Sequence, residues 1–237
     1  MRFDFAHLGV LDHYKLMTST IVPRPIAWVV SRSAVGTINI APFSFFNMFS
    51  GVPPLVCIGV GSRGPGARKD SARNISETGE FVICLVTEAL SEVMNFTAID
   101  FPGEVDEAAA SGLELAPSGL ASTPRIAASP VAFECRRYMT IEVGDARSII
   151  VGEVLAMEIA DRFVDPKKLY VDTPALRLIG RMHGGDGYVR LTDLFKMPRL
   201  PLPDASPAAT EAARSVPAEA PGAVGEEGAA APGRMSS

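Results

Sequence analysis

Six stretches within residues 1–200 have the length and composition of β-strands. Each is rich in Val, Ile or aromatic residues and is bounded by Gly, Pro, Asp or Ser, which favour turns. The six stretches are residues 25–32, 37–42, 55–60, 81–86, 131–143 and 148–159. Strands follow one another without long helices between them, and this succession favours a closed antiparallel barrel over a doubly wound parallel sheet.

Three shorter stretches between these strands are predicted to be helical. Asp70 is a candidate N-cap for a helix that runs to about Glu77 and ends at Gly79. Residues 88–99 carry apolar side chains at helical spacing, and residues 104–110 are a third candidate. The predicted class is therefore mainly β with a few short helices.

One Gly-rich segment imitates a dinucleotide-binding loop. Residues 59–64 match the spacing G-x-G-x-x-G and follow a predicted strand. Pro65 and Gly66 interrupt the helix that must begin there, and Glu80 precedes the next strand instead of following it. A Rossmann fold is excluded on this context.

The composition changes at Pro201. The chain has 237 residues, 47% of them hydrophobic, which is enough for one substantial core. Residues 201–237 are mostly Ala, Pro, Gly and Glu without an aromatic residue, so little apolar area is available to offset the entropy of ordering. We predict a domain over residues 1–200 and a disordered, solubilising tail over residues 201–237.

Charge and cysteine content limit the partners and the compartment. The net charge of -5 lies largely in the tail, and no basic stripe is present, so nucleic acid is not an expected partner. No apolar run approaches the roughly 20 residues of a membrane span, and the N-terminus lacks a signal-peptide pattern. Cys57, Cys84 and Cys135 are widely spaced and predicted to be buried reduced thiols. These features predict a cytoplasmic protein.

Polar residues collect just before the predicted helix at Asp70. Ser62, Arg63, Arg68 and Lys69 precede a helix start, where free N–H groups and the helix dipole favour an anion. Either these residues bind a phosphate group, or their charges are solvated loop charges. A second group is acidic and is interpreted as a solvated helix start or loop, and it comprises Asp100, Glu104, Asp106 and Glu107.

Residues 24–56 have the composition of a wall for a flat polar ring. Apolar β-formers occupy the ends of this region, while hydroxyl, amide and aromatic residues fill its middle. Ser44 and Asn47 stand within an aromatic run and must find polar partners, which a ligand can provide. The alternative role for Phe43, Phe45 and Phe46 is packing in a barrel core.

Several motifs in this order resemble the flavin reductase-like family of FMN-binding split β-barrels. They are VPRPIAWV at 22–29, NIAPFSFF at 39–46, PPL at 53–55, KDS at 69–71, EFV at 80–82 and GGDGY at 184–188. The resemblance extends from about residue 14 to about residue 199. It implies a six-stranded antiparallel Greek-key split barrel, usually a homodimer, that holds FMN without a covalent bond near the subunit interface.

The resemblance also implies roles for individual residues. The residues along the isoalloxazine ring and ribityl chain would be Phe43, Ser44, Phe45, Phe46 and Asn47, and those at the phosphate would be Ser62, Arg63, Lys69 and Ser71. Arg24 would meet either the phosphate or the N1–C2=O region of the ring. Tyr188 would stack on or hydrogen-bond to the flavin, or pack in the core.

His183 is the candidate catalytic residue. An imidazole there could orient a nicotinamide or donate a proton to reduced flavin, and the alternative is an exposed loop histidine. His7 and His13 lie far from it in sequence, so no metal-binding spacing is present. Hydrolase and zinc motifs such as G-x-S-x-G, H-E-x-x-H and C-x-x-C are also missing from the sequence.

The leading functional hypothesis is an oxidoreductase. FMN would accept a hydride from NADH or NADPH and pass electrons to free flavin, a partner oxygenase or oxygen. The alternative is an FMN-binding electron carrier or sensor with little reductase activity, because one barrel can host several functions. An empty structural barrel is a third possibility.

Overall fold

The computed structural model describes residues 1–200, and the predicted tail over residues 201–237 lies outside the described residues. Residues 1–194 form one compact unit. Its helices are η1 (Phe5–His7), α1 (Val10–Thr20), α2 (Asp70–Thr78), η2 (Glu88–Leu90), α3 (Ser91–Phe96), α4 (Glu107–Ser111) and η3 (Asp161–Phe163). None of these helices is long and apolar enough to cross a membrane.

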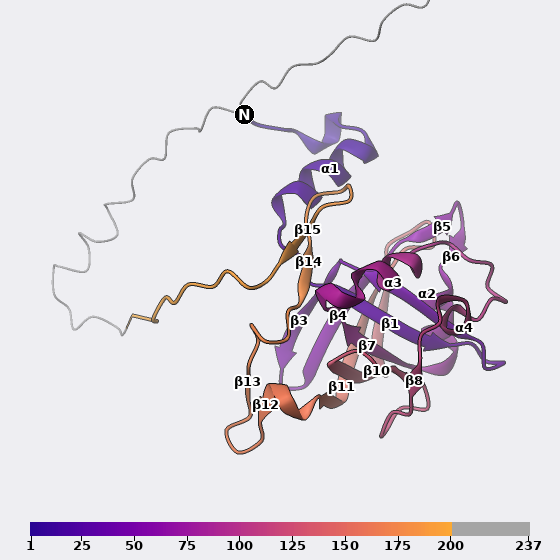
Figure 1. The fold of residues 1–237 in the computed structure, drawn as a ribbon. Helices are drawn as coiled ribbons and strands as arrows, with labels where there is room; N and C mark the ends of the chain where they lie inside the picture. The colour runs from indigo at the N-terminus through magenta and orange to yellow at the C-terminus, as the bar shows by residue number, and fades with distance from the viewer. Residues whose placement is uncertain (201–237) are drawn as a thin grey trace, which may run out of the picture. The chain divides into compact units, whose positions relative to one another are not determined.

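The main sheet of the domain, shown in Figure 1, is antiparallel. Within residues 1–200 it has seven strands, one more than predicted. They are β1 (Ala27–Arg32), β2 (Ile38–Phe43), β3 (Phe46–Gly51), β4 (Pro54–Val60), β7 (Glu80–Leu85), β10 (Val131–Glu142) and β11 (Ser148–Ile159). The strand order is β2-β1-β7-β10-β11-β4-β3. The two edge strands, β2 and β3, are joined by Ser44 and Phe45 alone, so the sheet must curve until its edges approach each other. This arrangement confirms the antiparallel, mainly β prediction.

Four two-stranded ribbons extend from the sheet. They are β5 (Ser62–Gly64) with β6 (Ala67–Arg68), β8 (Leu115–Ala116) with β9 (Arg125–Ile126), β12 (Val164–Asp165) with β13 (Tyr170–Val171), and β14 (Ile179–Arg181) with β15 (Tyr188–Arg190). The β5–β6 ribbon directly follows β4, where a Rossmann fold would place a helix. The structure therefore confirms that the Gly-rich segment 59–64 is not the dinucleotide-binding loop of a Rossmann fold.

The core lies on both faces of β1. Trp28 and Val30 pack in one apolar cluster with Met94, while Val29 packs in a second cluster with Ile75 of α2. Successive side chains of a strand point to opposite faces, so a strand covered on both sides needs a continuous apolar run. This requirement explains the sequence Ile-Ala-Trp-Val-Val at residues 26–30.

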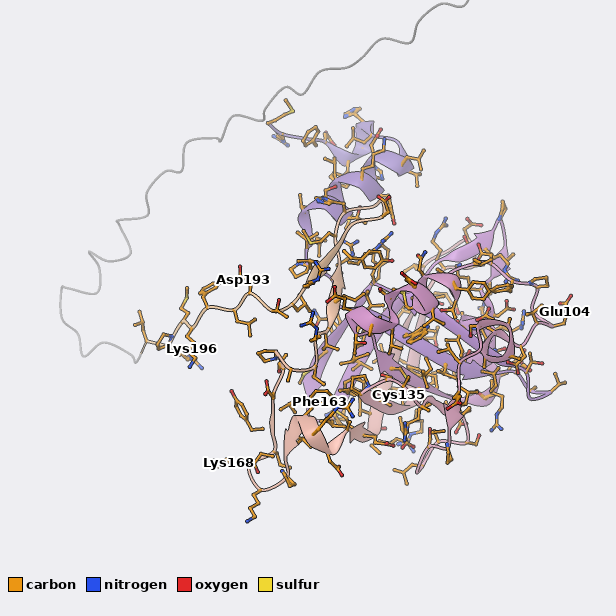
Figure 2. The ribbon with its side chains drawn as sticks, in the orientation of Figure 1. Glu104, Cys135, Phe163, Lys168, Asp193 and Lys196 are labelled. Atoms are coloured by element: carbon orange, nitrogen blue, oxygen red, sulfur yellow. The ribbon has the colours of Figure 1, made fainter. Side chains whose placement is uncertain are left out.

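The cysteines are unpaired, and two of them are buried as predicted. Cys84 and Cys135 are inaccessible to solvent, and Figure 2 shows Cys135 among the strands, whereas Glu104 and Lys168 lie at the periphery. Burial raises the pKa of the Cys84 thiol to about 11. Cys57 differs, because it is only partly buried and lines a cleft described below.

The predicted helices are present with shifted boundaries. Lys69 occupies the N-cap position of α2, and Asp70 is the first helical residue instead of the cap. Gly79 ends α2 in the left-handed conformation, at φ 77°, as its position predicted. The region 88–99 divides into η2 and α3, and α4 begins after Asp106, whose carboxylate accepts a hydrogen bond from the Ala109 N–H at 3.0 Å.

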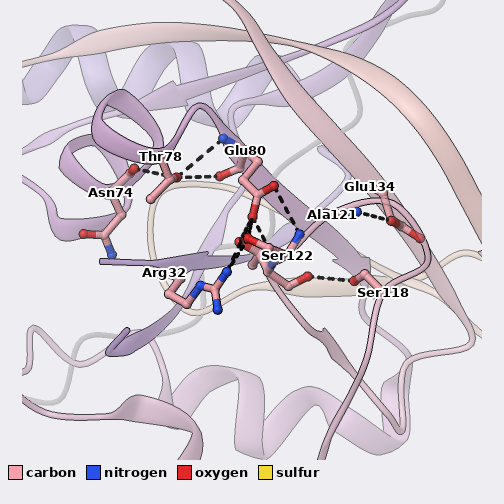
Figure 3. A network of polar contacts seen from close by, with 9 residues as sticks. Arg32, Asn74, Thr78, Glu80, Ser118, Ala121, Ser122 and Glu134 are labelled. Atoms are coloured by element: carbon pink, nitrogen blue, oxygen red, sulfur yellow. Dashed lines mark hydrogen bonds and ion pairs between the residues drawn. The ribbon is translucent and has the colours of Figure 1, made fainter. Parts of the chain in front are cut away.

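A polar network holds the loop between β8 and β9 against the sheet (Figure 3). The Glu80 carboxylate accepts hydrogen bonds from the N–H groups of Ser122 and Thr123, at 3.2 and 2.9 Å. Glu134 of the adjacent strand accepts three more, from the N–H groups of residues 119–121. Burial acts to raise the pKa of Glu80, but the bonds from Ser122 and Thr123 outweigh it and lower that pKa.

Candidate functional site: two clefts joined by one strand connection

A narrow cleft of about 60 Å³ lies where β2 meets the start of α2. The segment after α3 and the first turn of α4 close its other side. Its lining residues are Asn39, Ala41, Pro42, Phe43, Arg63, Lys69, Asp70, Ser71, Thr97, Ala98, Ile99, Asp100 and Glu107. Four residues implied for the flavin, Phe43, Arg63, Lys69 and Ser71, therefore meet here although they come from three different elements.

The two cations of the narrow cleft are held by carboxylates. The Arg63 guanidinium lies 2.9 Å from Asp70 Oδ2, and Lys69 Nζ lies 2.8 Å from Asp100 Oδ1. Both side chains are about 30% exposed, so neither is a freely solvated loop charge. The N-cap residue of α2 makes no side-chain capping bond, which leaves N–H groups of the first turn available to an anion.

Ser71 and Ser62 have different surroundings. The buried Ser71 hydroxyl accepts a hydrogen bond from Asn39 Nδ2 at 2.9 Å and lines the narrow cleft. Ser62 lies in β5 opposite Arg68 and does not line this cleft. Arg68 itself pairs with Glu142 on the surface, at 2.8 Å. The basic cluster seen in the sequence is therefore divided, with Arg63 and Lys69 in the cleft and Arg68 outside it.

Glu107 corrects the interpretation of the acidic cluster as solvated. Its side chain is 5% exposed, lines the narrow cleft, and accepts a hydrogen bond from the Ile40 N–H at 2.6 Å. Burial raises the pKa of Glu107 to about 7, and the nearby Asp70 carboxylate raises it further, while Arg63 and Lys69 act in the opposite direction. A carboxyl group that changes charge near neutral pH thus lies in the narrow cleft.

We expect Glu107→Gln to stabilise the protein at alkaline pH. The folded-state pKa of Glu107 lies above the ordinary value of 4.5, so its contribution to stability is present below that value and is lost as pH rises through about 7. Glutamine keeps an acceptor for the Ile40 N–H without the charge. Urea unfolding at pH 8 should show a gain of roughly 2 kcal/mol, and equal stabilities at pH 5 and pH 8 in the wild type would contradict the prediction.

A wide cleft of about 550 Å³ lies between α1 and the β3–β4 pair. Its volume is in the range that accommodates a cofactor or a drug-sized ligand. The lining residues are His13, Tyr14, Met17, Thr18, Ile21, Pro23, Arg24, Pro25, Ser44, Phe45, Phe46, Asn47, Phe49, Cys57, Gly59 and Ile149. Aromatic and aliphatic side chains predominate, which suits a flat conjugated ring.

The close approach of Phe45 to Gly59 shapes one wall of the wide cleft. The Phe45 carbonyl accepts a hydrogen bond from the Gly59 N–H at 2.7 Å, and a Cβ on residue 59 would stand 3.0 Å from Phe45 Cβ. Glycine therefore lets Phe45 lie against β4 while its ring remains 51% exposed. An exposed aromatic ring held in this way offers a stacking surface.

Arg24 lies in the wide cleft, and the narrow cleft does not include it among the described lining residues. Its Nη1 donates to the carbonyls of Thr18 at 2.6 Å and Ile21 at 2.9 Å, and its Nη2 donates to the carbonyl of His183 at 2.8 Å. Arg24 is therefore in a different cleft from Arg63 and Lys69.

The stretch from the end of β2 to the start of β3, residues 41–47, contributes to both clefts. Ala41, Pro42 and Phe43 line the narrow cleft, and residues 44–47 line the wide one. Phe43 is also buried in the core, so the packing role considered for it is present as well. One continuous stretch can therefore contact a ligand that has a phosphate at one end and a flat ring at the other.

His183 and Tyr188 line neither cleft. The His183 side chain is exposed, and the residue contributes through its backbone carbonyl, which binds Arg24. The Tyr188 ring is 40% exposed and carries the Arg181 guanidinium 4.5 Å above its centre.

We expect His183→Ala to retain turnover within about twofold of the wild type. The substitution keeps the carbonyl that binds Arg24 and removes only an exposed imidazole. Steady-state nicotinamide oxidation at saturating substrate tests this expectation. A roughly 100-fold slower turnover, with flavin content unchanged, would instead assign His183 a role in proton transfer.

Known proteins resemble this chain over most of its length. The model of the flavin reductase like domain matches residues 17–175. The chain belongs to the flavin reductase-like family. A protein of Deinococcus radiodurans is 46% identical over 203 residues, covering 84% of this chain and 89% of the relative.

Two solved structures share both the fold and substantial sequence identity. Nitrilotriacetate monooxygenase component B from Bacillus cereus is 30% identical, with a TM-score of 0.79, covering 83% of this chain and 98% of that one. The 2-nitrobenzoate 2-nitroreductase NbaA of Pseudomonas fluorescens is 36% identical, with a TM-score of 0.77, covering 88% and 100%. The fold is thus that of split-barrel flavin reductases, and the chain is a flavin-dependent oxidoreductase.

The residues present fit a flavin cofactor. The narrow cleft offers two cations and a helix N-terminus to a phosphate group, and the wide cleft offers aromatic walls to a ring system. The stretch of residues 41–47 lines both the narrow and the wide cleft. A flavin mononucleotide has the same order of parts, a phosphate, a flexible chain and a flat ring.

Sequence reasoning missed the contribution of α1 to the site. Tyr14, Met17, Thr18 and Ile21 follow the spacing i, i+3, i+4 and i+7, which places them on one face of a helix, and that face lines the wide cleft. The pattern was available in the sequence. The strands that form the wide cleft together with α1 could not be inferred from this pattern, because β3 and β4 come much later in the chain.

Proposed function

We propose that the protein binds FMN non-covalently and catalyses electron transfer from NADH or NADPH to an acceptor. The observation that carries the proposal is the stretch 41–47, which lines a cationic cleft at one end and an aromatic cleft at the other. Bound flavin would supply the redox chemistry, accepting a hydride and passing on electrons. The protein would supply binding, orientation and exclusion of water.

In this proposal each cleft has a defined task. Arg63 and Lys69 would exchange their carboxylate partners for the phosphate, with the first turn of α2 and Ser71 beside them. Ser44, Phe45, Phe46 and Asn47 would border the ring. Ser62 lies next to Arg63 on the β5–β6 ribbon and would reach the phosphate only from the cleft margin.

The physiological acceptor is proposed from the relatives. The Bacillus cereus protein is named as a component of a monooxygenase, which supports transfer to a partner oxygenase through reduced flavin. The Pseudomonas fluorescens protein is named as a nitroreductase, which supports direct transfer to a small organic acceptor.

An absorbance spectrum tests the proposal. The protein is incubated with FMN, desalted, and recorded before and after anaerobic addition of NADH or NADPH. Retained flavin bands that bleach with one nicotinamide support the reductase and identify its donor. Bands that persist would point to the alternative, an electron carrier or sensor with little reductase activity, and a colourless protein would overturn the cofactor assignment.

We also propose that a second copy of this chain covers the exposed apolar face of β3, β10 and β11. The exposed apolar side chains of this face are Met48, Phe49, Met139, Ile141, Ile149 and Met157. Phe49 and Ile149 also line the wide cleft, so a second copy would complete its wall. Sedimentation should give twice the mass of one chain, and the mass of a single chain would refute the proposal.

A further inference from the structure

Arg24 is a buried cation that is held without a carboxylate. Its side chain is 6% exposed, and the acceptors of its close hydrogen bonds are three backbone carbonyls. No ion pair joins it to an acidic residue within the described residues. A buried charge normally requires a partner of opposite charge. The carbonyls at the C-terminal end of α1 offset the charge of Arg24 in part, but no acidic residue in the lining of the wide cleft neutralises it.

Neighbouring groups reinforce this positive charge. Arg24 is the one permanently charged residue among the described residues that line the wide cleft, and no Asp or Glu is among them. Burial lowers the pKa of Arg24, and the positive charge of Arg181 lowers it further, while Tyr14 acts in the opposite direction. Arg181 is nearby because its backbone forms two hydrogen bonds with Arg24, at 3.0 and 2.8 Å.

The guanidinium is oriented in advance and keeps hydrogen-bonding capacity. Arginine has five N–H donors, and three of those of Arg24 are directed at the carbonyls of Thr18, Ile21 and His183. The Nε–H has only a long contact with Ser44 Oγ, at 3.5 Å, and one Nη2–H has no bond within the described residues. One N–H is therefore without a partner within the described residues, and a carboxylate could take this donor and replace Ser44 on the other.

The apolar lining limits what can carry the negative charge. Tyr14, Met17 and Ile21 line the wide cleft together with Phe45 and Phe46, and the Tyr14 and Phe45 rings are neighbours, with centroids 6.4 Å apart. Aromatic rings on a cleft wall favour flat conjugated ligands.

From this arrangement we propose that the wide cleft binds, as the electron acceptor, an aromatic carboxylate whose ring also carries a reducible substituent; the substituent takes up the electrons and protons, while the carboxylate stays unchanged on Arg24. The inference rests on the proposed function for the flavin that supplies the electrons. The positive charge, the available N–H donor and the apolar walls are properties of the chain itself. The structure thus assigns Arg24 a role in acceptor specificity.

The binding of a matched ligand pair tests this proposal. Benzoate and benzamide have the same shape and differ in charge. Calorimetric titration of the flavin-loaded protein with each ligand therefore measures how much the negative charge contributes to the affinity. We expect benzoate to bind at least tenfold more tightly. The flavin spectrum of each sample is recorded first, to establish that flavin is bound. If the protein binds no flavin, titration of the flavin-free protein shows whether the chain itself prefers benzoate.

Variants then assign the preference to one side chain. Arg24→Gln should abolish the preference for benzoate, whereas Arg24→Lys should retain part of it because the charge remains. Arg177→Gln removes a surface arginine paired with Glu88 and should leave the preference unchanged. Circular dichroism checks that each variant retains α1. A further test needs no variant: added salt should weaken the binding of benzoate to the wild type and leave the binding of benzamide unchanged.

Three results would overturn the proposal. Equal affinities for benzoate and benzamide in the wild type would exclude recognition of the carboxylate. A preference that survives in Arg24→Gln would place the recognition elsewhere. Loss of flavin from Arg24→Gln, together with an absent benzoate preference in the wild type, would assign the available N–H donor of Arg24 to the flavin ring instead of the acceptor.

Discussion

The double variant Arg63→Ala and Lys69→Ala should bind FMN at least 100-fold more weakly than the wild type. Each cation would form charge-assisted hydrogen bonds with the phosphate, worth roughly 1.5–3 kcal/mol apiece. About 1.4 kcal/mol corresponds to a tenfold change in the dissociation constant. Removal of both also leaves Asp70, Asp100 and Glu107 in the narrow cleft without these countercharges, which adds repulsion toward an anion. Fluorescence titration of flavin-free protein with FMN measures the change.

Two controls separate phosphate binding from folding. Riboflavin lacks the phosphate, so its affinity should be the same in the wild type and in the double variant. Arg68→Ala removes the cation that immediately precedes Lys69 but pairs with Glu142 outside the cleft, so FMN affinity should stay within about twofold. Unchanged FMN affinity in the double variant would remove the phosphate from the narrow cleft.

Trp28→Ala should lower the free energy of unfolding by about 3–5 kcal/mol, the range found for truncating a fully buried large aromatic side chain. Trp28 has no exposed surface, and its Nε1–H donates to Thr97 Oγ1 at 2.9 Å. The substitution would leave a cavity beside Met94 and Ile126 and remove one partner of Thr97, which lines the narrow cleft. Urea unfolding followed by circular dichroism measures the loss.

The matched variants for Trp28 differ in what they remove. Trp28→Phe keeps most of the apolar volume and loses the hydrogen bond, so the expected loss is smaller, about 1–2 kcal/mol. Tyr170→Ala truncates an aromatic ring that is largely exposed, and the expected change is within about 0.5 kcal/mol. A loss below about 1 kcal/mol for Trp28→Ala would show that the site around Trp28 repacks.

The strand pattern was predictable where local composition and tertiary burial agree. β1, β4 and β7 are short runs of Val, Ile and aromatic residues with turn residues beside them, and the structure has strands at each. β3 was missed because its sequence, Phe-Asn-Met-Phe-Ser-Gly, mixes polar and aromatic residues without alternation, and most of its side chains are exposed. That strand exists because β4 pairs with it.

The candidate site was predictable in part. The motif residues Ser44, Phe45, Phe46 and Asn47 lie together on one cleft, and Arg63, Lys69 and Ser71 lie together on the other. The burial of Glu107 was not predictable, because an acidic run beside a helix start is usually solvated, and only the packing of α4 against β2 covers this carboxyl group.

The sequence by itself determined an antiparallel, mainly β domain, the helix that ends at Gly79, and the motifs that place the chain in the flavin reductase-like family. These features depend on neighbouring residues along the chain, whose propensities and spacing can be read directly. Only the folded structure shows that Arg24 lines the wide cleft, that the His183 carbonyl accepts a hydrogen bond from Arg24, and that α1 forms a wall of this cleft. Those contacts join residues far apart in sequence, and their geometry depends on how the whole sheet curves.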